Sequence, residues 1–496
     1  MTDQAASSAA AGSHPGVEFP VAADGRRSTS AFGRGVIADA LRGTDPAGAF
    51  GAEHETNWRS GYLTHFRRVI EAGISSRRAA LAIARDGLAS LRGRMRSVRA
   101  DGAEAELDDL LRRRADRALG TETVTGTAEP ESELALPYRG ERLRGDALAR
   151  RLDAWVAAGI IEPSCAAAVR VVAANPQWLS LPGRTVAVLG AGSEIGPLPV
   201  LLRWGATVAG IDLPQPRIWE RVLTSARSSA GRLMVPVTGS GGELTTAAGA
   251  DLTSEIPELA DWISGAAGQL VLGNYVYADG AANVRVCAAA DTLTLRLQAI
   301  RDDLALAFLA TPTDVFAVPG EAVAYSARAY QDRPAALKLA GRPLRTLSGG
   351  RLLRRAYVPG SDPGISDNLV VQQGPNYALA KRLQRWRASL ARESVTTVSM
   401  NVAPPTRTRS VVKNRALAAA YAGAHRFGAE VFEPDTTRVL MAALLVHDLH
   451  VDHPAHEHPW QDEAYAAAHG GLWRIGYAPR SVLGLAALLG YGASRG

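Results

Sequence analysis

The chain has 496 residues, of which 47% are hydrophobic, and it carries a formal net charge of +6 at neutral pH. These values exclude a disordered polyelectrolyte, and the length favours a core of about 250 residues with flanking regions. The arginines that supply the charge are scattered over predicted helices, so a solvated helical face is favoured and no nucleic-acid surface is expected.

The cysteine content and the lack of long apolar runs predict a cytoplasmic protein. Cys165 and Cys287 are too few for a disulfide framework and lack metal-ligand spacing. The first eight residues are polar and acidic, unlike a signal peptide. No run of about 18 apolar residues occurs, so no membrane span is expected.

The N-terminal part of the chain divides into two predicted regions. Residues 1–50 are rich in Ala, Gly and Ser and are expected to be disordered. Residues 51–180 are predicted to be helical, because apolar residues recur at helical spacing with arginines between them, as in residues 76–85. This region could cap an active site, form an oligomer interface or dock a partner, and the pattern does not choose among these.

A short apolar strand, a glycine-rich turn and the start of a helix follow one another in residues 184–198. Glycines permit close backbone approach, and a helix N-terminus offers free N–H groups to a pyrophosphate. The next strand ends at Asp212, about 20 residues later, where a carboxylate can bind the adenosine ribose. The cofactor-binding residues predicted for the turn are Gly190, Gly192, Ser193, Ile195 and Gly196.

Further strands alternate with helical stretches along residues 181–450. They are predicted at 232–237, 269–274, 304–311 and 395–402, and the last runs into a proline-threonine turn. This alternation predicts an α/β protein with a doubly wound parallel sheet, Rossmann-like, in which ligands bind at the carboxyl ends of the strands. Residues 320–360 would be an insertion, and residues 451–496 a helical C-terminal extension.

Tyr377 and Lys381 form a candidate acid/base pair. Lysine occurs only three times in the chain, so a lysine four residues after a tyrosine is unusual here. Positions i and i+4 share a helix face, and a nearby ammonium would lower the pKa of the phenol. The pair therefore predicts a tyrosine that exchanges a proton with substrate.

The order of these motifs resembles the short-chain dehydrogenase/reductase superfamily, in the form of an extended, atypical member. The resemblance implies that Asp212 holds the ribose, that Asp251 and Leu252 lie against the adenine, and that Asn274 ends the fourth strand. It also implies that Tyr377 and Lys381 are the catalytic pair, that Lys381 binds the nicotinamide ribose, and that the segment from Asn401 to Thr408 closes over the nicotinamide.

Three positions depart from the family pattern. Glu194 stands where the middle glycine of the turn is usual, so a side chain faces the phosphate region. Ser366 is the serine nearest to the tyrosine in sequence and is the first candidate for the catalytic hydroxyl, with Thr311 and Thr313 as alternatives. Asn283 is a weak match to the family's helix asparagine.

The function predicted from these residues is an NAD(P)-dependent oxidoreductase that interconverts an alcohol and a carbonyl on a small, apolar substrate. Asp212 favours NAD, while Arg217 keeps NADP open. A homo-oligomer is compatible with the pattern. An S-adenosylmethionine-dependent methyltransferase is the first alternative, because its glycine turn is similar. The second is a non-catalytic scaffold, favoured by Glu194 and the displaced serine.

Histidines cluster between His447 and His458. Imidazole and carboxylate groups suit zinc or iron, but the cluster lacks the helical His-Glu-x-x-His spacing. A polar loop after an apolar helix is the favoured interpretation, and no metal site is predicted from the sequence.

Overall fold

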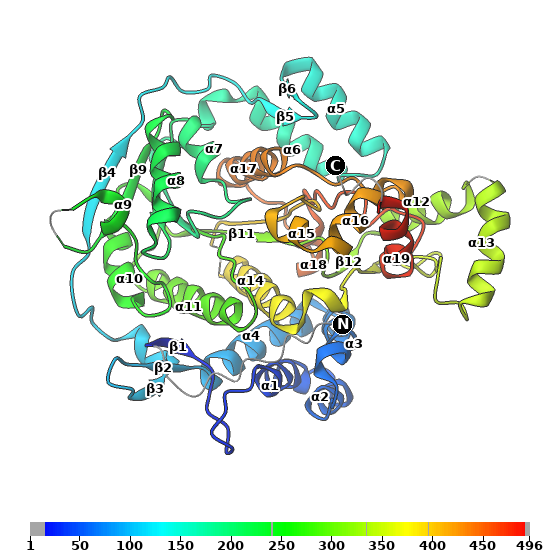
Figure 1. Ribbon diagram of the computed structural model, residues 1–496, viewed down its shortest axis with the longest axis horizontal. Helices are drawn as coiled ribbons and strands as arrows, with labels where there is room; N and C mark the ends of the chain where they lie inside the picture. Colours follow the sequence, from blue (N-terminus) through cyan, green and yellow to red (C-terminus); the bar gives the residue numbers. More distant parts are fainter. Residues whose placement is uncertain (1–14, 240–241, 334, 395, 492–496) are drawn as a thin grey trace.

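The computed structural model describes residues 15–239, 242–333, 335–394 and 396–491. Its centre is a seven-stranded, mostly parallel sheet in the order β14-β11-β10-β7-β8-β9-β4 (Figure 1). Numbered along the chain from β7, the six parallel strands follow the order 3-2-1-4-5-6, which is compatible with a Rossmann-like α/β fold. These strands are β7 (Arg184–Leu189), β8 (Thr207–Ile211), β9 (Arg232–Val237), β10 (Gln269–Asn274), β11 (Ala305–Ala310) and β14 (Val398–Val402).

Helices cover both faces of the sheet because alternate strand residues point to opposite sides. In β7, Val186 and Val188 belong to one core, whereas Ala187 and Leu189 belong to the other. The first core holds α5 (Gly145–Ala157), α6 (Pro163–Ala174), α7 (Leu198–Arg203), α8 (Pro216–Arg227) and α17 (Pro434–His450). The second holds α10 (Ile256–Ser264), α11 (Ala281–Gln298) and α14 (Pro375–Glu393).

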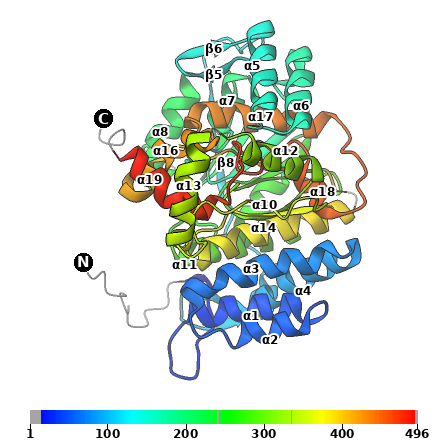
Figure 2. The same cartoon turned by 90° about the vertical axis from the view of Figure 1, so that its right-hand side faces the viewer.

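Four N-terminal helices form a further layer on the outer side of α14 (Figure 2). Gly87 allows the close approach, since a Cβ there would lie 2.3 Å from the ring of Trp386. Disorder was expected for residues 1–50, but residues 29–42 and 46–53 are helical, with Val36 and Ile37 fully buried. Residues 1–14 lie outside the described residues. The helices are α1 (Thr29–Arg42), α2 (Pro46–Glu53), α3 (Trp58–Ile74) and α4 (Arg77–Arg94).

Residues 96–143 contain strands where helices were expected. Their antiparallel strand β4 (Gly120–Thr125) extends the main sheet beside β9. Its alternating threonines and exposed side chains suit a sheet edge. The strand was not predicted because the neighbouring segments have a helical pattern. The short elements nearby are β1 (Gly16–Glu18), β2 (Arg96–Val98), β3 (Glu104–Glu106), η1 (Leu107–Leu111), β5 (Leu136–Tyr138), β6 (Glu141–Leu143) and η2 (Pro176–Trp178).

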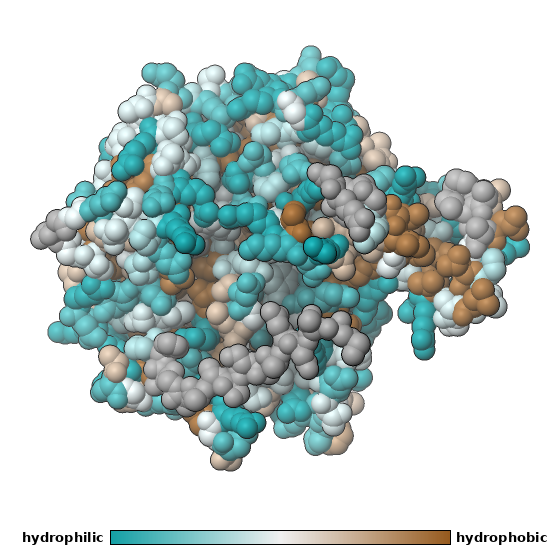
Figure 3. All heavy atoms as spheres, viewed as in Figure 1, coloured by the Kyte–Doolittle hydropathy of each residue, from teal (hydrophilic) through white to brown (hydrophobic). Residues whose placement is uncertain are grey.

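The segment between β11 and α14 includes a projecting arm around α13, at the right of Figure 1. Apolar side chains gather on this arm in the space-filling view, and Leu339, Leu344 and Leu347 are exposed (Figure 3). No helix in the described part of the chain is both long and apolar enough to cross a membrane. The remaining elements are α9 (Leu244–Ala247), β12 (Val315–Val318), α12 (Gly320–Gln331), α13 (Ala335–Leu347), β13 (Gly364–Asp367), η3 (Val371–Gln373), α15 (Arg409–Lys413), α16 (Arg415–Gly423), η4 (Ala424–Phe427), α18 (Pro459–Ala464) and α19 (Pro479–Gly490).

Candidate functional site

The glycine turn follows the carboxyl end of β7 and is joined to the end of β8. Gly190 has a φ of 85°, and a Cβ there would lie 2.9 Å from the carbonyl oxygen of Tyr275, so only glycine fits. The backbone N–H of Gly192 donates to Asp212 Oδ2 at 2.8 Å, and that of Leu213 donates to Oδ1 at 2.8 Å. Burial raises the pKa of Asp212, while these two hydrogen bonds act in the opposite direction. The turn and the acid predicted from the spacing therefore meet.

The first helix after the turn begins at the end of the segment predicted to contain its start. Ser193 N–H donates to the carbonyl of Gly190, and Gly196 N–H donates to that of Ser193, so residues 190–196 form successive turns. The helix α7 starts only at Leu198. Ile195 is partly buried and packs on the core beneath the turn. A pyrophosphate at this edge would face backbone N–H groups of the turn rather than the helix itself.

Arginines surround the glycine turn. Arg221 Nη2 donates to the carbonyl of Gly192 at 2.9 Å, and Arg438 donates from Nε and Nη2 to the carbonyl of Glu194. The Glu194 carboxylate accepts from the backbone N–H of Arg409, with Oε2 at 3.1 Å. Glu194 thus ties the turn to the segment after β14, and the guanidinium groups nearby favour an anionic ligand.

The segment after β14 spans the carboxyl edge of the sheet. Thr408 is the N-cap of α15, and its hydroxyl lies 2.9 Å from that of Ser410. The Ser410 hydroxyl also lies near the phenol of Tyr277, which follows β10 and donates to Asp279 Oδ1. Together with the Glu194 contact, this places the predicted Asn401–Thr408 turn region across the ends of β7 and β10.

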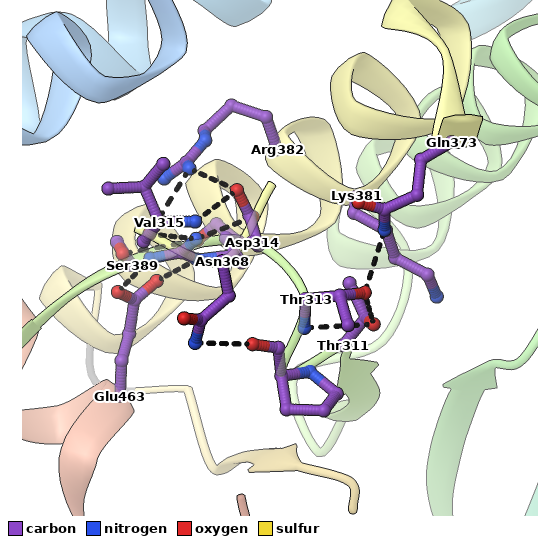
Figure 4. A network of polar contacts seen from close by, with 12 residues as sticks. Thr311, Thr313, Asp314, Val315, Asn368, Gln373, Lys381, Arg382, Ser389 and Glu463 are labelled. Carbon is purple, nitrogen blue, oxygen red and sulfur yellow. Dashed lines mark hydrogen bonds and ion pairs between the residues drawn. The ribbon is translucent and has the colours of Figure 1, made fainter. Parts of the chain in front are cut away.

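Tyr377 and Thr311 meet where β11 ends and α14 begins. Thr311 is the first residue after β11, and Tyr377 lies in the first turn of α14. Burial raises the pKa of Tyr377, and the nearby Thr311 hydroxyl acts in the opposite direction. The Thr311 hydroxyl lies 2.8 Å from that of Thr313, which accepts from Gln373 Nε2 at 2.7 Å (Figure 4). The tyrosine is therefore flanked by a chain of hydroxyl groups.

Lys381 lies one helical turn beyond Tyr377, but its ammonium group is directed elsewhere. Its Nζ donates to the carbonyl of Leu309 and to Gln384 Oε1, both at 3.2 Å. Gln384 Nε2 in turn donates to Asn274 Oδ1 at 3.3 Å. The expected lowering of the tyrosine pKa by Lys381 is not found, because the net direction at Tyr377 is upward and burial lowers the pKa of Lys381 itself.

Ser366 lies in β13, apart from this chain of hydroxyl groups. Its Oγ accepts from Asn368 Nδ2 at 3.0 Å and lies near the phenol of Tyr357, which donates to the carbonyl of Trp473. β13 pairs with β12, and Ser366 stands opposite Phe316. Sequence proximity to the tyrosine favoured Ser366, but of the three candidate hydroxyls Thr311 is the one that lies close enough to Tyr377 to influence the pKa of its phenol.

The remaining predicted residues support loops at the sheet edge. Asp251 Oδ1 accepts from the backbone N–H and the hydroxyl of Thr253, both at 2.8 Å, and Leu252 is buried in the core. Asn283 Oδ1 accepts from the backbone N–H of Ala278, so it holds the loop after β10. None of these contacts involves the Tyr377 group.

Gln384 and Gln373 were not singled out in the sequence. Gln384 follows Lys381 by three residues, so helical spacing alone places the two on one face. Gln373 reaches Thr313 across 60 residues, and no local pattern signals that contact. Comparisons with known protein-family models and with curated proteins found no match. The resemblance to short-chain dehydrogenases therefore rests on the arrangement of motifs alone.

Proposed function

We propose that the protein is an NAD(P)-dependent oxidoreductase that interconverts a carbonyl and an alcohol. The observation that carries the proposal is the meeting of Thr311 and Tyr377 at the carboxyl end of β11, with Lys381 one helical turn away. In open parallel sheets, ligands bind at the carboxyl ends of the strands, where the glycine turn also lies. Such a reaction needs a proton donor and a nucleotide-binding loop at the same edge of the sheet.

The residues at the turn fit a dinucleotide. Each carboxylate oxygen of Asp212 accepts one backbone N–H and keeps lone-pair capacity for a ribose hydroxyl. Arg221 and Arg438, whose guanidinium groups contact carbonyls of the turn, would face the diphosphate. Glu194 would remain paired with Arg409 and so would not face the phosphates as a free charge. When bound, the cofactor supplies or accepts the hydride.

Tyr377 would hold and deliver the proton in this reaction. Burial raises its pKa, so the phenol stays protonated at neutral pH and can donate its proton to a carbonyl oxygen. The Thr311 hydroxyl would donate a hydrogen bond to the same oxygen as negative charge develops there. Lys381, bound to Gln384, would position the sugar next to the reacting carbon.

The first test measures thermal unfolding with NAD, NADP, their reduced forms and S-adenosylmethionine, each added separately. A ligand that binds only the folded protein adds about 2.7 kcal/mol of stability at a hundredfold excess over its dissociation constant. We expect a nicotinamide cofactor to raise the unfolding midpoint. We then expect the reduced cofactor to be oxidised when apolar aldehydes or ketones are added as substrates. No shift with any nicotinamide cofactor would contradict the proposal.

Matched variants then separate binding from chemistry. Tyr377→Phe and Thr311→Val should keep the thermal shift with cofactor and lose carbonyl reduction by at least about 100-fold. Ser366→Ala should retain reduction, because its hydroxyl contacts Asn368 rather than Tyr377. Full activity of Tyr377→Phe would exclude the assigned proton donor even if cofactor binds.

A second candidate, an S-adenosylmethionine-dependent methyltransferase, is favoured by the contact between Gly192 and Asp212, which suits any adenosine nucleotide. It leaves the meeting of Thr311 and Tyr377 without a role. A non-catalytic scaffold is favoured by Glu194, whose carboxylate joins the turn to Arg409. A thermal shift with S-adenosylmethionine alone would favour the methyltransferase. No shift with any of the ligands would favour the non-catalytic scaffold.

A further inference from the structure

The loop between α17 and α18 brings two imidazoles and one carboxylate together. Nδ1 of His456 lies 2.8 Å from Asp462 Oδ1, and Nδ1 of His453 lies 3.7 Å from the same oxygen. One potential ligand atom from each of these residues lies within 4.8 Å of the other two. The histidines come from the loop and Asp462 from α18, so the cluster joins two segments of the chain.

This cluster lies at the opposite edge of the sheet from the candidate nucleotide site. Arg392, near the end of α14, donates to the carbonyl of Val398, where β14 begins. Asp448, near the end of α17, accepts from the hydroxyl of Ser399, the next residue of β14. Arg392 and Asp448 both interact electrostatically with His453, so the cluster lies near the amino ends of the parallel strands. It has no part in the site at the carboxyl ends.

We propose that His453, His456 and Asp462 bind a divalent transition-metal ion, zinc in the first instance, and so fasten the α17–α18 loop to α18. Two imidazoles and one carboxylate are donors that zinc accepts, with water completing a tetrahedral site. Ligand bonds of about 2.0–2.2 Å put two donors of such an ion roughly 3.4 Å apart. The two distances to Asp462 Oδ1, 2.8 and 3.7 Å, lie on either side of that value.

Binding replaces two hydrogen bonds of the imidazoles by bonds to the ion. His456 Nδ1 and Asp462 Oδ1 share a hydrogen bond, and His453 Nδ1 shares a longer one of 3.1 Å with the carbonyl of Pro454. The ion would bind the lone pair of Nδ1 in each neutral imidazole, with the single ring proton on Nε2, so these two hydrogen bonds are given up and no net proton is lost. Both imidazoles are partly exposed, with 23% and 21% of their side-chain surface accessible, so an ion can reach them.

The surrounding charges and rings favour this use of the cluster. Asp448 and Asp462 attract a cation at His453, while burial and Arg392 oppose it. The ring of Tyr465 packs 4.9 Å from His453 and 5.8 Å from His456, which restrains both imidazoles.

The test uses the full-length protein, stripped with a chelator and then titrated with Co²⁺ as a spectroscopic probe for zinc. We expect about one ion per chain, a visible absorption band of a low-symmetry site, and displacement of the band by Zn²⁺. His453→Ala, His456→Ala and Asp462→Asn should each weaken Co²⁺ binding by more than about 100-fold, since each removes a direct ligand. His458→Ala is the matched control, because it changes a histidine of the same loop that is outside the cluster.

Circular dichroism of each variant distinguishes loss of the site from loss of the fold. Asp462→Asn keeps the shape of the side chain, so it serves as the test variant if an alanine variant does not fold. Zn²⁺ should raise the unfolding midpoint of the wild type and of His458→Ala but not that of Asp462→Asn. No Co²⁺ band in the wild type, or a band that persists in folded Asp462→Asn, would overturn the proposal. Neither result depends on nicotinamide binding.

Discussion

Asp314 is the centre of a buried charge network that fixes the loop after β11 against α14. Its Oδ1 accepts from Arg382 Nη2 at 2.9 Å and its Oδ2 from Arg385 Nη1 at 2.6 Å (Figure 4). Arg385 also binds the carboxylate of Glu463. The carboxylate of Asp314 and both guanidinium groups are no more than 2% exposed. Asp314 lies three residues after Thr311, so the network holds the threonine beside the helix that carries the tyrosine.

Replacing Asp314 by Asn keeps the shape of the side chain and removes its charge. Arg385 retains Glu463, but Arg382 is left with neutral acceptors, the amide oxygen of the new side chain and the carbonyl of Val315 at 3.4 Å. An unpaired buried charge of this kind costs about 3–5 kcal/mol. The matched surface variant, Asp303→Asn, breaks a pair with Arg301 whose carboxylate is 43% exposed, and should cost about 0–1 kcal/mol.

The assay is urea unfolding, followed by tryptophan fluorescence and circular dichroism, whose coincidence tests for a single transition. Adding Arg382→Met to Asp314→Asn should restore part of the lost free energy of unfolding, because the uncompensated cation is then gone. A loss for Asp314→Asn no greater than that for Asp303→Asn would refute the assignment of a stabilising role to the network. Failure of Arg382→Met to restore stability would locate the cost in geometry rather than charge.

Two further predictions concern stability. Burial raises the pKa of Glu162, but hydrogen bonds from His469 and Arg474 prevail and lower it from 4.5 to about 2. A depressed acid stabilises the fold above its unfolded pKa, so between pH 4.5 and 2 the wild type should lose about 3 kcal/mol more than Glu162→Gln. Equal losses in acid titrations of urea stability would contradict this. A Cβ at Gly490 would lie 2.0 Å from the carbonyl of the facing helix α16, whereas one at Gly484, in the same helix α19, would meet nothing within 4 Å. Gly490→Ala should therefore destabilise by about 1–3 kcal/mol and Gly484→Ala stabilise by up to about 1 kcal/mol, and melting curves that show the same sign for both would disprove the close helix contact.

The sequence by itself determined the strands of the central sheet and the glycine turn. Residues 184–189, 232–237 and 269–274 are strands as predicted, because apolar runs bounded by glycine and polar residues are local signals. The link between the turn and Asp212 also followed from spacing, since a strand, a turn and a second strand have a fixed length.

Contacts between distant segments were decided only by the tertiary structure. Sequence distance favoured Ser366 beside Tyr377, but the chain between β11 and α14 leaves the sheet and returns, so Thr311, 66 residues before the tyrosine, is its partner. For the same reason, the sequence did not predict the pairing of β4 with β9, the cluster at Asp462 or the network at Asp314. Local periodicity records which face of an element is apolar, whereas the partner of each polar side chain depends on how the elements pack.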